Sequence, residues 1–574
     1  MKTTKILAII ITALLALSTL FACAPQGNQN NGGGDTAPKP VSVQITNTQN
    51  VYMDEIVDNS FLMQVEVKNA TDKSVKYQLT QENDYVAVSD SGVVTLQPNT
   101  PEWYAFEVTA QSYADTQQSD SITFTVLATR SSMSGQGQIG QIIASVNGNP
   151  STCRGISWFT SADVEESDLV LSTSRDMKDA KLYLGLSNTF TKPATEWDED
   201  FNLGAETYYN HKVTLTDLTP DTTYYYKVGS QKLGLYSDVC SFKTSGGEAD
   251  SVNVFITTDV HYGSREDAST KYYHAAIADA FTRYGYVDMA LDCGDFKSQW
   301  KVGTSYYYFE EEWIKSMASM SPLLKTTTFV PVNGNHDNSN PTNYNTDFDY
   351  AFFNHYNVPA SPAEIDDGQR QGLNYSFDVG AAHLVVFNYS YNGVVATAAQ
   401  KQWLENDLKS STKQWKVVFS HAELSADVKA IVEKYGVTLA FNGHEHVYKH
   451  SKPMLGDVAQ SMNVTSGDSK NFVLNNQVGT TYVTNSTTGG ADSWGSKEIA
   501  MDNYLCAFQL NTNLGATSSQ LALGDLGTVK SGWGMYSVLT ISQNSLMVSV
   551  FLRNSTSPNT PFTLLHTYGF TISL

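Results

Sequence analysis

Alternating hydrophobic and polar positions run through the first part of the chain in short blocks. The clearest blocks lie at 61–67, 85–88 and 121–126, and turn-forming residues separate them at short intervals. Alternation with a period of two residues is typical of strands that bury one face. The pattern therefore predicts an all-β sandwich, immunoglobulin-like in type, over residues 40–130.

A second β-rich block is predicted at residues 149–246, after a Gly/Ser/Gln-rich stretch at 131–141 that we expect to be a linker. In its most regular part, 212–228, a turn at Pro220-Asp221 separates a short strand from a Tyr-rich strand. Neither block carries a cluster of titratable side chains that suits catalysis. We therefore expect both blocks to be spacers or binding platforms.

After Ser251, strand-like runs alternate with segments of helical spacing, which indicates an α/β layered domain over 251–574. From about Asn471 the runs are β-rich again, including 536–541 and 546–551, and we expect them to complete this domain's second sheet. The predicted strands are 252–257, 287–292, 328–332, 415–419 and 437–441, and the predicted helices are 272–283, 306–320, 398–409 and 428–434.

Composition and charge narrow the class of protein. A chain of 574 residues is too long for one core and suggests three or four domains. Acidic residues outnumber basic ones by 58 to 36, which gives a net charge of −22. We expect no stable nucleic-acid partner, because this charge repels a polyanionic duplex. A small phosphorylated substrate remains compatible with it, since two bound cations reverse the charge inside one pocket.

The N-terminus has the pattern of an export signal. A basic start at 1–5 precedes an apolar, uncharged run at 6–22, which is on the short side for a permanent span of about 30 Å. Leu20-Phe21-Ala22-Cys23 resembles a bacterial lipobox, which implies a signal peptide over 1–22 and lipid on the Cys23 thiol. The polar stretch that ends at 39 would be a flexible linker. We therefore expect an exported protein that is lipid-anchored to the cell envelope, unless Cys23 merely ends an ordinary signal.

The other four cysteines suggest structural roles. Cys153 and Cys240 flank the second β-rich block and could form a disulfide in an oxidising compartment, if their Cα atoms approach closely enough. Cys293 and Cys506 are expected to be small buried apolar residues. No two cysteines have CxxC spacing, so the sequence offers no thiolate zinc site.

Short polar motifs follow the five predicted strands of the α/β domain. Ligands gather beyond the carboxyl ends of strands in open α/β sheets, so we expect these motifs to converge. These motifs contain five of the eleven histidines in the chain. Chance does not explain so many histidines at the ends of predicted strands. In chain order the motifs are Asp259-Val260-His261, Gly294-Asp295, Gly334-Asn335-His336-Asp337, His421 and Gly443-His444-Glu445-His446.

The residue types in these motifs favour a metal site. Imidazole, carboxylate and amide oxygen without thiolate suit Zn, Fe or Mn. About seven candidate ligands exceed the three or four that a single zinc ion needs, so two ions that share a bridging carboxylate are predicted. Glycines at 294, 334 and 443 let the chain turn abruptly beside the ligands.

The order of the motifs resembles the calcineurin-like metallophosphoesterase superfamily. The preceding block resembles a fibronectin type III domain and the N-terminal domain of purple acid phosphatases, so the likeness covers about 149 to the C-terminus. It implies a β-sandwich flanked by helices and a centre of two divalent or trivalent metal ions. The implied ligands are Asp259, His261 and His446 for the first ion, Asp295 as the bridge, and Asn335, His421 and His444 for the second ion. His336 would be catalytic and face the substrate, and Asp337 and Glu445 would orient the ligands.

The sequence departs from the purple enzymes at two positions. Those enzymes carry a tyrosine three residues after the bridging aspartate, and its phenolate on ferric iron gives the colour. Here that position is Ser298, and His261 stands where the purple enzymes usually have glycine. A neutral nitrogen thus replaces an anionic oxygen at the first metal, which predicts a colourless centre that does not need ferric iron.

The implied reaction is metal-dependent hydrolysis of phosphate monoesters by a hydroxide that two metal ions activate. His336 would stabilise charge or protonate the leaving alkoxide. Two alternatives stay open. One is a phosphodiesterase or nucleotidase of the same superfamily, and the other is a cell-surface adhesion or carbohydrate-binding protein with an inactive metal domain.

Several aromatic and histidine side chains outside the motifs have less specific interpretations. Tyr306, Tyr307 and Tyr308 could line the mouth of the pocket or pack on one face of a helix. His450 follows the last motif closely and could reach the substrate. The histidines expected to be ordinary surface or packing residues are His211, His274, His355, His383, His450 and His566.

Overall fold

The structure is a computed structural model of the chain, which divides into two units at residues 1–40 and 41–574. The predicted signal segment and Cys23 lie outside the described residues. No helix in the described part of the chain is long and apolar enough to cross a membrane. The described residues are 39–47, 50–53, 56, 59–97, 100, 104–127, 137–192, 206–247, 249–261, 268–296, 300–302, 305–307, 317, 320–337, 356–365, 372–389, 395–467, 471–489, 504–509, 534–553 and 560–572.

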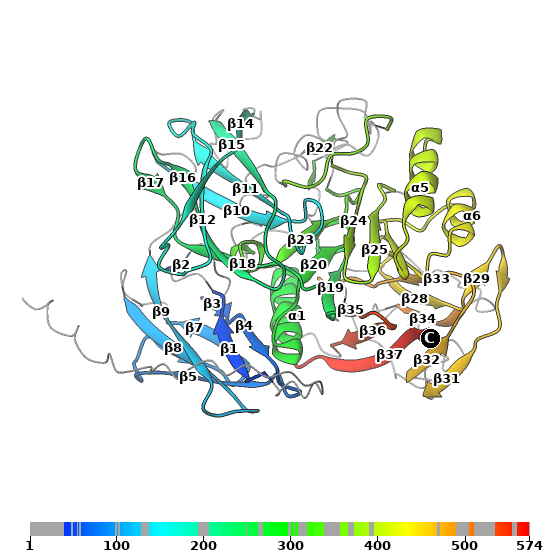
Figure 1. Cartoon of the computed structure of the whole chain (residues 1–574), viewed down its shortest axis with the longest axis horizontal. Coiled ribbons are helices and arrows are strands. Elements are labelled where there is room, and N and C mark those ends of the chain that lie inside the picture. The colour runs from blue at the N-terminus through cyan, green and yellow to red at the C-terminus, as the bar shows by residue number, and fades with distance from the viewer. Residues whose placement is uncertain are drawn as a thin grey trace, which may run out of the picture. The chain divides into compact units, whose positions relative to one another are not determined.

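The first nine strands form a β-structure with a hydrophobic core of its own (Figure 1). One sheet has the order β2-β9-β8-β5, a second has β3-β7-β6, and β1 pairs with β4. Phe106, Val108 and Phe124 are buried in this core, as the alternating pattern predicts for one face of each strand. The strands are β1 (Ser42–Ile45), β2 (Asn50–Tyr52), β3 (Ser60–Leu62), β4 (Val65–Lys68), β5 (Val75–Leu79), β6 (Val86–Val88), β7 (Val93–Leu96), β8 (Ala105–Ser112) and β9 (Ser119–Leu127).

The second β-rich block begins earlier than the sequence suggests. Part of the predicted linker at 131–141 is wrong, because β10 (Ile139–Ser145) already starts there. Ile139, Ile142 and Ile143 are all buried, and their burial outweighs the Gly and Gln residues that suggested a linker. The remaining strands are β11 (Arg154–Ser161), β12 (Asp168–Ser172), β13 (Lys181–Leu184), β14 (Leu186–Lys192), β15 (Glu206–Leu215), β16 (Thr223–Ser230), β17 (Leu235–Tyr236) and β18 (Cys240–Lys243).

The second block contains a sheet in the order β13-β12-β16-β17, with β18 on β16, and two larger sheets build most of the rest of the described chain. The larger one runs β14-β15-β11-β10-β23-β20-β19-β35-β36-β37-β32-β31, so it continues from the second block into the α/β domain. Parallel pairing of β10 with β23 at Ser145 and Phe329 makes this junction. The other sheet runs β24-β25-β26-β27-β33-β28-β34. The α/β prediction for this region is therefore confirmed, with few helices.

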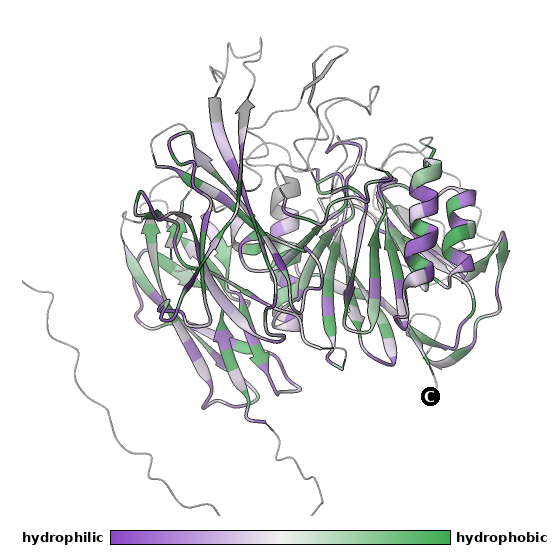
Figure 2. Ribbon diagram, turned by 45° about the horizontal axis from the view of Figure 1, so that its top comes forward, coloured by the Kyte–Doolittle hydropathy of each residue, from purple (hydrophilic) through white to green (hydrophobic). Residues whose placement is uncertain are grey.

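One hydrophobic core fills the space between the two sheets, and a second lies under two helices. Val254 and Leu384 belong to the inter-sheet core, whereas Val385 packs with Trp403 and Val428 of α5 and α6. Successive residues of β25 thus face opposite sides, which explains its unbroken apolar sequence. Figure 2 shows the hydrophilic and hydrophobic faces of these two helices. A capping box at Thr397 and Gln400 starts α5.

These two sheets and their helices carry the elements that position the motifs (Figure 1). Observed and predicted bounds agree within a few residues for five strands and three helices. The helices are α1 (Ala268–Tyr284), α3 (Ser321–Leu324), α5 (Ala398–Ser410) and α6 (Ala426–Lys434). The strands are β19 (Val252–Thr257), β20 (Met289–Asp292), β21 (Trp300–Val302), β22 (Ser305–Tyr307), β23 (Thr328–Pro331), β24 (Tyr375–Val379), β25 (Ala382–Val386), β26 (Trp415–Phe419), β27 (Leu439–Asn442), β28 (Val447–Ser451), β29 (Met454–Leu455), β30 (Val458–Ala459), β31 (Val464–Gly467), β32 (Asn471–Asn475), β33 (Thr481–Thr484), β34 (Tyr504–Gln509), β35 (Met535–Ile541), β36 (Ser545–Leu552) and β37 (Thr563–Thr571).

Two predictions of secondary structure are wrong in part. Of the strands after Asn471, β33 and β34 lie in the seven-stranded sheet, as expected, but the last three do not. β35 pairs antiparallel with β19, and β36 and β37 follow it in the larger sheet. The helix predicted at 306–320 is also wrong at its start, where Tyr306 and Tyr307 lie in β22 and pair with β21. Tyrosine favours strands, and the antiparallel partner decides the conformation. Tyr308 lies outside the described residues.

Cys153 and Cys240 are not joined by a disulfide. Cys153 packs against the turn at Gly148, where an added Cβ would lie 3.2 Å from its Sγ atom. Cys240 is buried on β18 opposite Tyr226, in the core of the second block. Each thiol thus has its own packing environment. Cys293 is buried, as predicted, whereas the side chain of Cys506 lies outside the described part.

Candidate metal centre

The five polar motifs meet where the two sheets face each other. Asp259, Asp295 and Asn335 follow β19, β20 and β23, which are neighbouring parallel strands of the larger sheet. His421 and His444 follow β26 and β27, which are parallel neighbours in the other sheet. The convergence that the sequence predicts therefore occurs across two sheets rather than along one.

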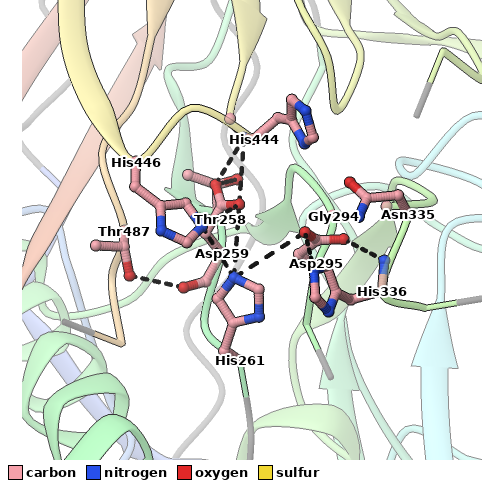
Figure 3. Close-up of polar contacts among 12 residues, drawn as sticks. Thr258, Asp259, His261, Gly294, Asp295, Asn335, His336, His444, His446 and Thr487 are labelled. Atoms are coloured by element: carbon pink, nitrogen blue, oxygen red, sulfur yellow. Dashed lines mark hydrogen bonds and ion pairs between the residues drawn. The ribbon is translucent and has the colours of Figure 1, made fainter. Parts of the chain in front are cut away.

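The first group of side chains contains Asp259, His261 and His446, which point toward one another (Figure 3). The Nε2 atom of His446 lies 3.2 Å from Oδ1 of Asp259 and 2.9 Å from Nε2 of His261. Asp259 is fully buried, and Thr258 donates a hydrogen bond of 2.7 Å to its Oδ2 atom. This group offers two imidazole nitrogens and a carboxylate oxygen within one small space.

Asp295 lies between the first group and the rest of the site (Figure 3). Its Oδ2 atom is 4.0 Å from Nε2 of His261, 3.9 Å from Nε2 of His336 and 3.1 Å from Nε2 of His421. One carboxylate oxygen therefore faces histidines from three separate motifs. This is the position that a bridging ligand between two cations requires.

The second group contains Asp295, His421 and His444, with Asn335 beside it. Nδ1 of His421 lies 2.8 Å from the carbonyl oxygen of Cys293, so that hydrogen bond leaves Nε2 facing the site. The same Nε2 atom lies 3.1 Å from Oδ1 of Asn335. The second group thus combines imidazole, carboxylate and amide oxygen, as the sequence predicts.

At the candidate ligands the backbone has a conformation that residues other than glycine seldom adopt. Left-handed φ angles between 48° and 68° occur at five predicted ligands. Such angles cost of order 1–3 kcal/mol each outside glycine and gather at functional sites. The surrounding structure therefore holds these ligands in place against the local preference of their backbone. The five ligands are Asp259, His261, Asp295, His444 and His446.

At two motif positions glycine is required because a neighbouring loop lies too close for a Cβ atom, and not because of the φ angle. A Cβ atom on Gly334 would lie 2.1 Å from the backbone nitrogen of Asp295. A Cβ atom on Gly443 would lie 1.8 Å from Oγ1 of Thr258 and 2.4 Å from Oδ2 of Asp259. These glycines let loops from different strands touch directly.

Asp337 and Glu445 lie beside the ligands. The Oδ2 atom of Asp337 accepts hydrogen bonds from the backbone nitrogens of Gly334 and Asp295, at 2.8 and 2.9 Å. It therefore fastens the third motif to the second. Oε2 of Glu445 forms an ion pair of 2.7 Å with Lys449. These contacts fit the supporting roles that the sequence suggests.

Burial and charge set the protonation of the site. Burial lowers the pKa of His261 to about 3, and burial together with His421 lowers the pKa of His444 to about 4. Burial opposes ionisation of Asp259, yet His446 holds its pKa at about 2. Burial likewise opposes the charge on His421, but Asp295 raises its pKa to about 10. Neutral imidazoles and ionised carboxylates are the forms that bind metal, and His421 would release a proton on binding.

A buried polar run, which the sequence motifs do not include, supports the first group. Oγ1 of Thr487 donates a hydrogen bond of 2.7 Å to the carbonyl oxygen of Asp259, and Oγ of Ser486 donates one of 3.1 Å to the carbonyl oxygen of His446. The backbone nitrogen of Thr488 donates 2.9 Å to the carbonyl oxygen of Thr258. The available signal was the run Asn485-Ser486-Thr487-Thr488 directly after β33.

The buried histidines outside the motifs contact neighbouring side chains. His211 and His383 are buried, and His450 lies with its ring centroid 4.0 Å from that of Tyr568. His566 is buried and bonds Tyr448. His274 is half-buried, and His355 and Ser298 lie outside the described residues.

The donor set fits a pair of cations. Among the described residues, three groups of His and Asp have ligand atoms within 4.8 Å of one another, and His261 and Asp295 each belong to two of these groups. All donors are nitrogen or oxygen, which suits borderline or hard ions. Fold and site together define a phosphoesterase-type α/β sandwich with a candidate dinuclear metal centre.

Comparison with known families agrees with this class. Residues 139–244 match the purple acid phosphatase N-terminal domain, and residues 252–448 match the calcineurin-like phosphoesterase domain. The chain therefore contains a purple acid phosphatase N-terminal domain followed by a calcineurin-like metallophosphoesterase domain. The first of these matches begins where β10 begins.

Individual relatives are distant. Purple acid phosphatase 21 of Arabidopsis thaliana is 24% identical over 46% of this chain and 60% of its own length. Acid phosphatase type 7 of Mus musculus is 25% identical over 43% of this chain and 58% of its own length. The chain thus spans less than two thirds of these curated relatives. A purple acid phosphatase from yellow lupin seeds matches 93% of this chain and 96% of its own, with 14% identity and a TM-score of 0.57, which shows a shared fold.

Proposed function

We propose that the chain hydrolyses phosphate monoesters in a metal-dependent reaction, as an acid phosphatase. The observation that carries this proposal is the position of Asp295, whose Oδ2 atom faces His261 and His421 from opposite groups. Cations held by the two groups would supply Lewis acidity and a positive field for a phosphate group. Relatives named as acid phosphatases support the same reaction.

The protein's own residues have separable tasks in this proposal. Asp259, His261 and His446 would hold one cation, Asn335, His421 and His444 the other, and Asp295 both. His336 has the chemistry to stabilise the phosphoryl oxygens or to protonate the leaving alkoxide. Its side chain is 21% exposed, against 3% for His446 and 0% for His421, so it is more accessible from solvent than these two ligands. The backbone nitrogen of His336 donates a hydrogen bond of 2.7 Å to Oδ1 of Asp295, and this bond fixes the position of His336.

The test is hydrolysis of p-nitrophenyl phosphate by purified protein, before and after treatment with EDTA and after reloading with Zn²⁺, Mn²⁺ or Fe²⁺. We expect EDTA to abolish turnover and reloading to restore it. A bis-aryl phosphate and a set of nucleotides are assayed in parallel. Faster turnover of the diester or of nucleotides would replace the monoesterase proposal with a phosphodiesterase or nucleotidase. Absence of turnover by fully loaded protein would favour a binding protein.

We further propose that the active protein is colourless. Ser298 stands where the purple enzymes have the tyrosine that colours their ferric iron. An absorption spectrum of active protein, recorded with its metal content, tests this directly. A visible charge-transfer band would contradict it.

We also propose that the protein is exported and held at the cell envelope by lipid on Cys23. The support is the basic start, the apolar run and the lipobox-like tetrad that ends at Cys23. Wild-type protein expressed in a bacterium should partition into the detergent phase of Triton X-114, and Cys23→Ser should partition into the aqueous phase. Equal partitioning of the two would overturn the anchor.

A further inference from the structure

A buried lysine lies on the strand that directly follows the last ligand motif. Lys449 is on β28, and its side chain is 7% exposed. Its Nζ atom lies 2.8 Å from Oε2 of Glu423 and 2.7 Å from Oε2 of Glu445. A buried ammonium group is stabilised by pairing with carboxylates, and the two glutamates supply this pairing.

The two glutamates belong to different ligand loops. Glu423 comes two residues after His421, and Glu445 stands between His444 and His446. Lys449 therefore connects the loop after β26 with the loop after β27. The other oxygen of Glu423, Oε1, is bound by Lys429 of α6 at 2.7 Å. The linkage thus extends from the helix layer to both loops.

We propose that Lys449 is a positioning residue that sets the spacing between His421 and His444, and with it the affinity of the second metal site. It acts through Glu423 and Glu445 and has no role as a ligand. The inference rests on the proposed metal-dependent function, but it concerns metal affinity and so can be tested without turnover.

The first group has supports that do not involve this lysine. Thr487 holds the carbonyl of Asp259, and Thr258 holds its carboxylate. The proposal therefore predicts an unequal effect on the two sites. Glu445 also adjoins His446 of the first group, but Ser486 holds the carbonyl of His446 independently of the lysine. Loss of Lys449 should therefore weaken the site of His421 and His444 and leave the site of Asp259, His261 and His446 nearly unchanged.

The experiment measures stepwise Zn²⁺ affinity of full-length, folded protein by competition with a chromophoric chelator. Lys449→Met should weaken the second binding step by about 10–100-fold, the usual effect of losing a group that orients metal ligands. Turnover should fall at limiting Zn²⁺ and recover at saturating Zn²⁺. Lys449→Arg, which keeps the charge, should restore part of the affinity.

Lys434→Met is the matched control. Lys434 also forms a glutamate pair, at 2.6 Å to Glu405, but its side chain is 61% exposed and lies at the end of α6. The Lys434→Met variant should leave both binding steps unchanged. If Lys449→Met does not fold, the double variant Glu423→Gln/Lys449→Met removes one charge of each sign and takes its place.

The outcomes separate the two proposals. A folded Lys449→Met protein, or the double variant in its place, with wild-type affinity at the second step would overturn the positioning role and leave the proposed hydrolase intact. Weaker second-site affinity without hydrolysis of any ester by wild-type protein would support positioning and overturn the hydrolase. Wild-type protein that binds none of Zn²⁺, Mn²⁺ and Fe²⁺ would overturn both.

Discussion

His261 and His446 place their Nε2 atoms 2.9 Å apart, although 185 positions separate them in the chain. Two imidazole nitrogens at this distance require a proton or a cation between or beside them. Burial holds the pKa of His261 at about 3, so protonation of that ring is disfavoured near neutral pH. The fold thus brings together two nitrogen ligands whose best common partner is a metal ion.

Replacement of His336 should separate catalysis from metal binding. His336→Ala removes the exposed imidazole but leaves the ligands proposed for both cations. We expect turnover of an aryl phosphate to fall by about 100–10,000-fold, the usual contribution of a general acid. Elemental analysis should still find wild-type metal content. Loss of metal together with activity would instead make His336 a ligand.

Replacement of Asp295 should remove both properties. Its carboxylate faces histidines of both groups, so Asp295→Ala leaves each group without its shared oxygen. We expect metal content well below that of the wild type and no measurable turnover. Asp176→Ala, at an exposed turn of the second β-rich block, should change neither quantity. Retention of both metal ions by Asp295→Ala would remove the bridging role.

Gly443 tests whether contact between ligand loops matters. In Gly443→Ala the new methyl group meets Thr258 and Asp259, so one loop must move. We expect weaker metal binding and a loss of about 1–3 kcal/mol in unfolding free energy, as for other overpacked sites. Chelator competition and urea unfolding measure the two effects. Gly247→Ala is the control, because among the described residues the added Cβ atom would lie no closer than 3.8 Å to a neighbour, Oδ2 of Asp250.

His383 predicts a pH dependence of stability away from the metal centre. Its nitrogens lie 2.7 Å from Asp378 and 2.8 Å from Asp407, and although burial opposes the charge, these partners raise its pKa to about 9. Because the folded pKa exceeds the unfolded value near 6.5, the stabilisation is complete below 6.5 and is lost as the pH rises through 9. It amounts to at most about 3 kcal/mol, and less because Asp378 is partly exposed.

Urea unfolding at pH 7 and pH 9.5 measures this effect. The difference in stability between wild type and His383→Gln should shrink at the higher pH. His211→Gln provides the comparison, because burial lowers the pKa of His211 to about 4 and its contribution stays constant above pH 7. A constant difference for His383→Gln would show that His383 is neutral in the folded protein.

Strands and motifs are local properties, and the sequence predicts them well. The run 252–257 is predicted as a strand and is β19 in the structure, because its apolar residues fit a buried strand and little else. The candidate ligands were found because Asp, Asn and His follow such strands directly. Tyr306 and Tyr307 show the limit, since their conformation depends on a partner strand that helical spacing does not reveal.

The residue types at the strand ends, and therefore the chemistry available to the protein, can be read from the amino-acid sequence. Three features become visible only in the folded chain: the strand ends come from two facing sheets, Asp295 lies between the groups, and Lys449 connects two ligand loops. The difference arises because hydrophobic periodicity is set by neighbours along the chain. Pairing between sheets and buried ion pairs depend on contacts between residues far apart in it.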